Sequence, residues 1–123
     1  MLLQASSALA QGPPGKWVIP PEAKTEKSTV KPSADVLKKG KGAYDTRCAR
    51  CHGPEGQGNG PDARRNAPPA DLAALNLTDN PDGVLYYKVW NGQPPKMPAF
   101  KTLMTKDDVW AVVHYTKSLR KKG

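Results

Sequence analysis

The sequence predicts an all-α fold, and three observations lead to this prediction. Apolar residues recur at helical spacing in three segments, residues suited to capping precede these segments, and no segment alternates as a strand does. The chain between the segments is rich in proline and glycine, 13 and 11 in all, which favour turns and loops. With 123 residues, of which 37% are hydrophobic, the chain suits one small domain with a thin core.

The first predicted helix begins after Ser33, whose hydroxyl can cap it, and runs into the two cysteines of the chain. Gly40 and Gly42 lie inside this helix, where each glycine costs about 1 kcal/mol relative to alanine. We therefore expect another helix to cross closely at Gly40. The alternative is a frayed helix that begins only at Ala43. The expected inward face consists of Val36, Leu37, Gly40 and Tyr44.

The second predicted helix has Asp79 or Asn80 as its cap and Pro81 in its first turn. It is expected to end at Asn91-Gly92, because glycine is favoured just past a helix C-terminus.

The third predicted helix begins at Thr105 and carries Asp107 and Asp108 in its first turn. The basic residues 120–122 at its end complement the helix dipole, as the two aspartates do at its start. Its apolar stripe is Val109, Val112, Val113 and Thr116, with Trp110 and Tyr115 on either side.

The two cysteines lie in the sequence Cys48-Ala49-Arg50-Cys51-His52. Cysteines at this spacing occur in dithiol redox proteins, in zinc sites and in haem attachment sequences. A thioredoxin-type pair needs a βαβ context, and a zinc site needs a second pair of ligands, neither of which the sequence offers. A histidine directly after the second cysteine is the signature of c-type haem attachment. On a helix, Cys48, Cys51 and His52 share one face, so two thioethers and one imidazole can reach a single porphyrin.

Haem iron takes a sixth ligand on the opposite face, and methionine or histidine there makes an electron-transfer site. Met97 is the predicted ligand, because the prolines on both sides of it restrict its backbone. Met104 precedes the last helix and is expected to fill a gap in the core. His114 is expected to be a surface or packing histidine.

Residues 35–120 resemble the class I c-type cytochromes, which are small single-haem electron carriers. Four segments carry the resemblance: Gly40-x-x-x-Tyr44-x-x-x-Cys48, then Cys48 to His52 with the following Gly53-Pro54-x-Gly56-x-Gly58-x-Gly60-Pro61, then Met97-Pro98-Ala99-Phe100, and finally Trp110-x-x-Val113-x-Tyr115. The resemblance implies a compact cytochrome c fold of three to five helices around one covalently bound haem c, with His52 and Met97 as axial ligands. It also implies that the last helix crosses Gly40 through Tyr115 or Trp110.

The resemblance carries further expectations for the surroundings of the haem. A backbone carbonyl in the loop of Pro68 and Pro69 is expected to accept the imidazole N–H of His52. The glycine-rich loop after His52 follows a helix and lacks a lysine at the expected place, so it is not predicted to bind phosphate. Arg64, Arg65, Trp90 and Lys96 either neutralise the haem propionates or are simply solvated. The apolar residues expected around the haem are Leu72, Leu75, Leu77, Val84, Leu85, Val89, Phe100 and Leu103.

The chain is divided into three parts. Residues 1–10 are interpreted as the remnant of a signal peptide, with a small-residue pattern at Ala8-Leu9-Ala10, and they predict export to the bacterial periplasm. Residues 11–34 form an extended arm rich in proline and lysine, and residues 35–123 form the haem domain. Residues 17–20 in the arm either pack onto the haem domain or dock to a partner. No segment has the roughly 18 consecutive apolar residues of a membrane-spanning helix.

The expected function is electron transfer by a monomeric carrier that is not an enzyme, because filled axial positions leave no open site at the iron. The net charge of +8 by itself fits a nucleic acid, an anionic membrane surface or an acidic protein. With the haem motif, the expected partner is an acidic redox protein, such as a dehydrogenase, reductase or oxidase, and not a nucleic acid. Lysines such as Lys41, Lys96 and Lys101 are expected to surround the exposed haem edge. Three alternatives remain open. They are a dedicated electron-accepting subunit of a dehydrogenase complex, a haem peroxidase or ligand-binding protein with a labile Met97, and a dithiol redox protein.

Overall fold

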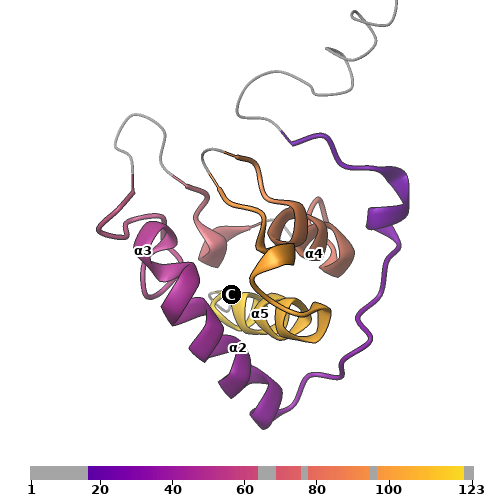
Figure 1. Cartoon of the computed structure of the whole chain (residues 1–123), viewed down its shortest axis with the longest axis horizontal. Helices are drawn as coiled ribbons and strands as arrows, with labels where there is room; N and C mark the ends of the chain where they lie inside the picture. The colour runs from indigo at the N-terminus through magenta and orange to yellow at the C-terminus, as the bar shows by residue number, and fades with distance from the viewer. Residues whose placement is uncertain (1–16, 64–68, 76–77, 95–96, 121–123) are drawn as a thin grey trace, which may run out of the picture.

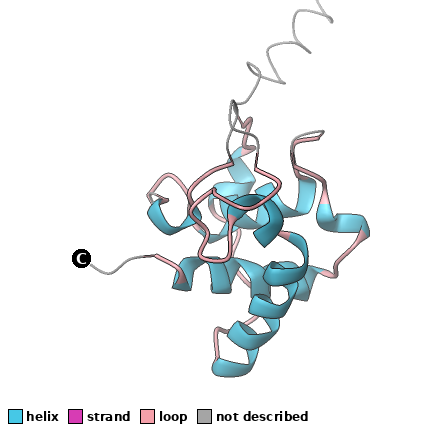
Figure 2. Ribbon diagram, turned by 90° about the vertical axis from the view of Figure 1, so that its left-hand side faces the viewer, coloured by secondary structure: helices cyan, strands magenta, loops and turns pink. Residues whose placement is uncertain are grey.

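The computed structural model describes residues 17–63, 69–75, 78–94 and 97–120. Within these ranges the structure consists of helices and loops, and its only pairing of strand type is an isolated antiparallel bridge between Gln93 and Met97. The elements are η1 (Pro21–Lys24), α2 (Ala34–Arg47), α3 (Ala49–His52), η2 (Leu72–Ala74), α4 (Asp82–Asn91), η3 (Phe100–Thr102) and α5 (Lys106–Ser118) (Figure 1). Figure 2 shows the same helices joined by long loops. The all-α prediction is confirmed.

The crossing of α2 and α5 is the most extensive contact between two elements (Figure 1). At the crossing, a Cβ atom added to Gly40 would collide with the backbone carbonyl of Ala111 and would lie 2.9 Å from Cβ of Tyr115. Glycine therefore lets the two backbones approach each other, as predicted, and the residue opposite is Tyr115. Since α2 is helical from Ala34 onwards, the alternative of a helix that begins only at Ala43 is wrong.

Side-chain caps fix the starts of α2 and α5. The hydroxyl of Ser33 accepts a hydrogen bond from the backbone N–H of Val36 at 3.1 Å. At α5, the hydroxyl of Thr105 accepts from the N–H of Asp108 at 3.1 Å, and the Asp108 carboxylate accepts from the N–H of Thr105 at 3.4 Å. This reciprocal capping box satisfies two backbone donors that the helix leaves open. Both predicted starts are confirmed.

Helix α4 begins one or two residues later than predicted. Pro81 is its N-cap, and the carbonyl of Pro81 accepts from the N–H of Val84 at 2.9 Å. The N-cap position thus falls on Pro81 and not on Asp79 or Asn80, and the Asn80 side chain accepts a hydrogen bond from Nζ of Lys88 at 2.8 Å. The predicted end of α4 is confirmed, because the helix stops at Gly92, whose φ of +62° lies in the left-handed region.

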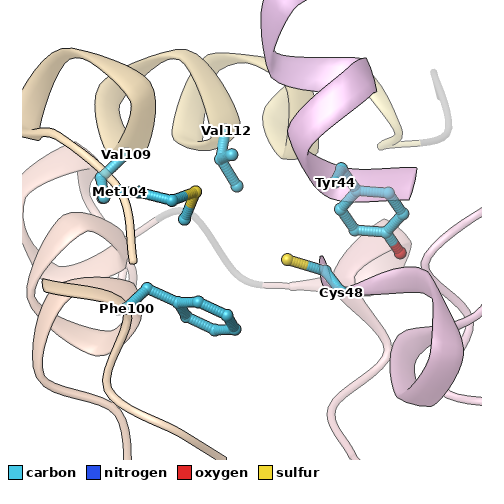
Figure 3. Packing of buried hydrophobic residues seen from close by; sticks show 6 residues of the cluster. All are labelled: Tyr44, Cys48, Phe100, Met104, Val109 and Val112. Carbon is cyan, nitrogen blue, oxygen red and sulfur yellow. The ribbon is translucent and has the colours of Figure 1, made fainter. Parts of the chain in front are cut away.

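The core lies where α4 and α5 meet the end of α2 and the segment around η3 (Figure 3). The predicted stripe of α5 is buried, and Met104 is only 8% exposed among the core residues, so its predicted role as core filler is confirmed. Leu103, one of the residues expected around the haem, is 50% exposed in the protein alone. Phe100 and Met104, four residues apart, both point inward from the turn of η3, which leaves Leu103 on its outer side. Leu77 lies outside the described residues.

The described part of the arm packs against α4 and α5, and in Figure 1 the indigo segment descends beside α4 before it reaches the start of α2. Ala23 is buried against Gly83, and the ring of Trp17 lies 5.5 Å from Nζ of Lys88. Nε2 of the buried His114 lies 2.8 Å from the carbonyl oxygen of Val30, so His114 is a packing residue. The proposed signal-peptide remnant, residues 1–10, lies outside the described residues. None of the described helices is long and apolar enough to cross a bilayer.

The two glycines of α2 provide a matched test of the crossing. Gly40→Ala should lower the free energy of unfolding by about 1–3 kcal/mol, because its methyl group would overpack the crossing. Gly42 has open space around its Cα, so Gly42→Ala should raise the free energy of unfolding by about 0.5–1 kcal/mol through helix propensity. Urea unfolding of the mature protein measures both values, and equal effects of the two substitutions would contradict the account of the crossing.

Candidate functional site

Cys48, Cys51 and His52 lie on one continuous turn at the junction of α2 and α3. The N–H of Cys48 donates to the carbonyl of Tyr44 at 2.8 Å, and the carbonyl of Cys48 accepts from the N–H of His52 at 2.9 Å. Cys48 ends α2 and is the N-cap of α3, and the bond from the His52 N–H closes the first turn of α3. Residues three and four apart on such a turn lie on one side, which is where Cys51 and His52 stand relative to Cys48. The structure thus brings together the three residues that the sequence predicted.

The thiol of Cys48 lies in the core. Figure 3 shows its sulfur pointing from the α2–α3 junction toward the side of the core occupied by Met104 and Phe100. Burial raises the pKa of Cys48 to about 12, and this effect outweighs the nearby cation of Arg47. Dithiol redox proteins depend on a thiolate with a lowered pKa, so this environment disfavours the dithiol alternative. Among the described residues, no group of three or more His, Cys, Asp or Glu side chains is placed to hold a metal ion.

The imidazole of His52 is oriented by one hydrogen bond. Its Nδ1 lies 3.0 Å from the carbonyl oxygen of Ala70, the residue after Pro69. A carbonyl oxygen only accepts, so Nδ1 carries the proton and Nε2 keeps its lone pair. Burial lowers the pKa of His52, which favours the neutral ring further. Nε2 is therefore available as a metal ligand, and the bond to Ala70 increases its basicity.

The glycine-rich loop after His52 folds back onto α3. The N–H groups of Gly58 and Gly60 donate to the carbonyls of His52 and Cys51, at 2.7 and 3.0 Å. Gly53 and Gly58 have φ values of +88° and +81°, which side-chain-bearing residues rarely adopt. These contacts satisfy the carbonyl groups that a helix C-terminus leaves open. The loop therefore supports the helix that carries the motif.

Two methionines approach the core from the same stretch of chain. Met97 is half-buried against the cluster that contains Cys48, and Met104 lies within that cluster. The backbone of Met97 is held by two hydrogen bonds to Gln93, in which the Met97 carbonyl accepts at 2.7 Å and the Met97 N–H donates at 3.0 Å. The loop that carries Met97 is therefore closed on itself, which limits the positions that its thioether can reach.

The remaining residues predicted near the haem or on the docking face lie in several different parts of the structure. Trp90 is half-buried and stacks on Tyr86 at 5.8 Å between ring centroids. Lys41 forms a 2.6 Å ion pair with Asp45, and this hydrogen bond raises the pKa of Lys41, whereas Lys101 is exposed on η3. Arg64, Arg65 and Lys96 lie outside the described residues.

Two hydrogen-bonding groups near His52, a backbone carbonyl and a tyrosine hydroxyl, were not identified from the sequence. The acceptor carbonyl of Ala70 has no sequence signal, because every residue carries a carbonyl group. The hydroxyl of Tyr44 donates to the carbonyl of Gly53 at 2.5 Å. Its signal was the spacing of four residues before Cys48, which places both side chains on one face of α2.

A turn that carries two cysteines and a histidine with a free Nε2 offers the donors that covalent attachment of a c-type haem requires. Residues 37–120 match the sequence profile of the family described as cytochrome c. The match spans more than half of the chain, and the chain therefore belongs to the cytochrome c family, whose members carry covalently bound haem c. The two thiols and Nε2 of His52 are the donors that this group requires.

Solved structures show the same fold. One similar chain belongs to the Kuenenia stuttgartiensis reducing HAO-like protein complex Kustc0457/Kustc0458, with a TM-score of 0.64 and 28% identity over 76% of this chain and 48% of that chain. Another is the KustC0563 c-type cytochrome, with a TM-score of 0.57 and 25% identity over 67% of this chain and 98% of that chain. The present chain thus spans about half the length of the first of these. A search of curated proteins gave no match.

Proposed function

We propose that the protein is a monomeric electron carrier with one haem c, bound through Cys48 and Cys51 and ligated by His52 and Met97. The observation that carries this proposal is the hydrogen bond from Nδ1 of His52 to the carbonyl of Ala70, which leaves the lone pair of Nε2 free on the turn that carries both cysteines. One haem is proposed because the chain contains two cysteines, both in this one motif. When bound, the haem supplies an iron that accepts and releases one electron between Fe(III) and Fe(II).

Met97 is preferred to Met104 as the sixth ligand because of how the two side chains are held. Met104 is fixed in the core beside Val109 and Val112, and its N–H donates to the carbonyl of Phe100 at 2.8 Å. Met97 is half-buried on a closed loop at the margin of the same cluster, so its sulfur can serve a ligand without removing a core side chain. A thioether ligand raises the reduction potential relative to a second nitrogen ligand, which suits electron transfer.

A role in electron transfer without catalysis follows from these ligands. If His52 and Met97 occupy both axial positions, the chain offers no open coordination site for a substrate. The net charge of +8 supports an acidic partner protein, and Lys101 is exposed close to the Met97 loop. Export to the bacterial periplasm is supported by the sequence of residues 1–10.

A dedicated subunit of a larger redox complex is the second candidate function. The observation that favours it is the similar chain in the reducing HAO-like protein complex. The described part of the arm gives this candidate no support, because Trp17 and Ala23 contact α4 of the same chain. Copurification from the native source separates the candidates, since a subunit would elute with a stoichiometric partner and a carrier would elute alone.

Matched substitutions of the two methionines test the ligand assignment. Met97→Leu should leave the haem attached, abolish the weak red absorption band of the oxidised protein, and lower the reduction potential by a sizeable part of the roughly 0.8 V that axial ligation spans. Met104→Leu keeps the core volume, so the band and the potential should persist, with a loss of stability below about 1.5 kcal/mol. Visible spectra and redox titrations provide both readouts. Loss of the band in Met104→Leu alone would assign the ligand to Met104, and tight carbon monoxide binding by the reduced wild-type protein would favour the labile-methionine alternative.

A pair of lysine variants tests the expected docking face. Lys101 on η3 and Lys24 on η1 are both exposed, so Lys101→Gln and Lys24→Gln remove the same charge at different places. Oxidation of the reduced protein by the anion hexacyanoferrate(III) should slow as ionic strength rises. At low salt, Lys101→Gln should slow it about two- to threefold and Lys24→Gln much less. Stopped-flow measurements that give equal effects, or no dependence on salt, would count against docking near η3.

A further inference from the structure

Tyr44 places a fully buried hydroxyl group beside the turn that follows His52. The side chain is 0% exposed, and its hydroxyl donates to the carbonyl of Gly53 at 2.5 Å. Burial, reinforced by the nearby Cys48, raises the pKa of Tyr44, so the phenol stays protonated and remains a hydrogen-bond donor. Phenylalanine would make the same apolar contacts in α2. The hydroxyl group therefore requires its own explanation.

The carbonyl of Gly53 belongs to backbone that constrains His52 from two sides. On one side, Gly53 follows His52 directly and turns the chain out of α3 with a φ of +88°. On the other side, the Gly53 carbonyl also accepts from the N–H of Gly56 at 3.1 Å, and the Gly56 carbonyl accepts from the N–H of Leu72 at 2.5 Å. Leu72 lies two residues after Ala70, whose carbonyl accepts the proton on Nδ1 of His52.

We propose that Tyr44 is a positioning residue for His52, whose hydroxyl fixes the Gly53 turn and thereby the hydrogen bond between the imidazole and Ala70. This inference rests on the proposed function, since it concerns His52 as a ligand. A well-formed hydrogen bond from Nδ1–H to the carbonyl of Ala70 increases the basicity of the ring as a ligand of iron. A more basic ligand favours the oxidised metal, so the Tyr44 hydroxyl should lower the reduction potential. Its removal should loosen the turn, weaken the bond to Ala70 and raise the potential.

A purely structural role for Tyr44 makes a different prediction. Its ring packs against that of Tyr115, with 5.3 Å between the centroids and 55° between the planes, next to the crossing of α2 and α5. Within the part of the chain that the structure describes, the Tyr115 hydroxyl has no hydrogen-bond partner. Tyr115→Phe is therefore a matched control, because it removes a hydroxyl from the same ring pair and leaves the Gly53 carbonyl untouched.

The test compares the full-length, haem-loaded wild type with Tyr44→Phe, Tyr115→Phe and a protein that carries p-aminophenylalanine at position 44. In the reduced protein, NMR measures the exchange of the Nδ1 proton of His52 with water, and a redox titration gives the potential. Tyr44→Phe should exchange this proton about tenfold faster, which corresponds to about 1.4 kcal/mol, and should have a higher potential. Tyr115→Phe should match the wild type, and p-aminophenylalanine, which retains a donor, should restore both values.

The outcomes separate this inference from the proposed function. If Tyr44→Phe had the proton exchange rate and the reduction potential of the wild type, Tyr44 would have a packing role only. This result would overturn the inference, even if the variant were less stable. If Tyr44→Phe failed to acquire haem, recovery with p-aminophenylalanine would support the role of the donor, and failure of both proteins would overturn it. A wild-type chain without covalent haem would instead refute the proposed function, whatever the variants showed.

Discussion

The constraint on which the structure depends is that one helical turn must present two sulfur atoms and one imidazole nitrogen on the same side. Cys48, Cys51 and His52 meet this requirement because Cys48 begins the turn of α3 and the bond from the His52 N–H to the Cys48 carbonyl closes it. The following loop supports this turn, because Gly58 and Gly60 supply the amide donors that its carbonyl groups need. The hydrogen bond to Ala70 then selects the imidazole tautomer that can bind iron.

The crossing of α2 and α5 connects this turn to the rest of the domain. Gly40 allows the helices to approach, and Tyr44, one turn further along α2, is buried beside Tyr115 of α5. One more turn places Cys48 in the cluster that α5 and η3 complete. The same helix thus makes the principal tertiary contact and ends at Cys48, the first residue of the proposed attachment motif. A shift of α2 along α5 would consequently move the thiol that is proposed to hold the haem.

Much of this fold was predictable from sequence because its signals are local. Ser33 and Thr105 cap the helices that follow them, Gly92 ends α4, and Gly40 marks the crossing. The errors arose where geometry beyond the immediate sequence decides the outcome. Pro81, and not Asp79 or Asn80, occupies the N-cap position of α4. The motif identified the thiols and the imidazole, whereas the acceptor carbonyl of Ala70 became identifiable only once the loop was placed in space.

The mass and spectrum of the mature, purified protein test the central claim most directly. The account predicts that the denatured chain weighs the polypeptide plus one haem, takes up no thiol-alkylating reagent, and gives a pyridine haemochrome spectrum of a haem joined by two thioethers. A colourless protein with the mass of the bare polypeptide and two alkylatable thiols would contradict it.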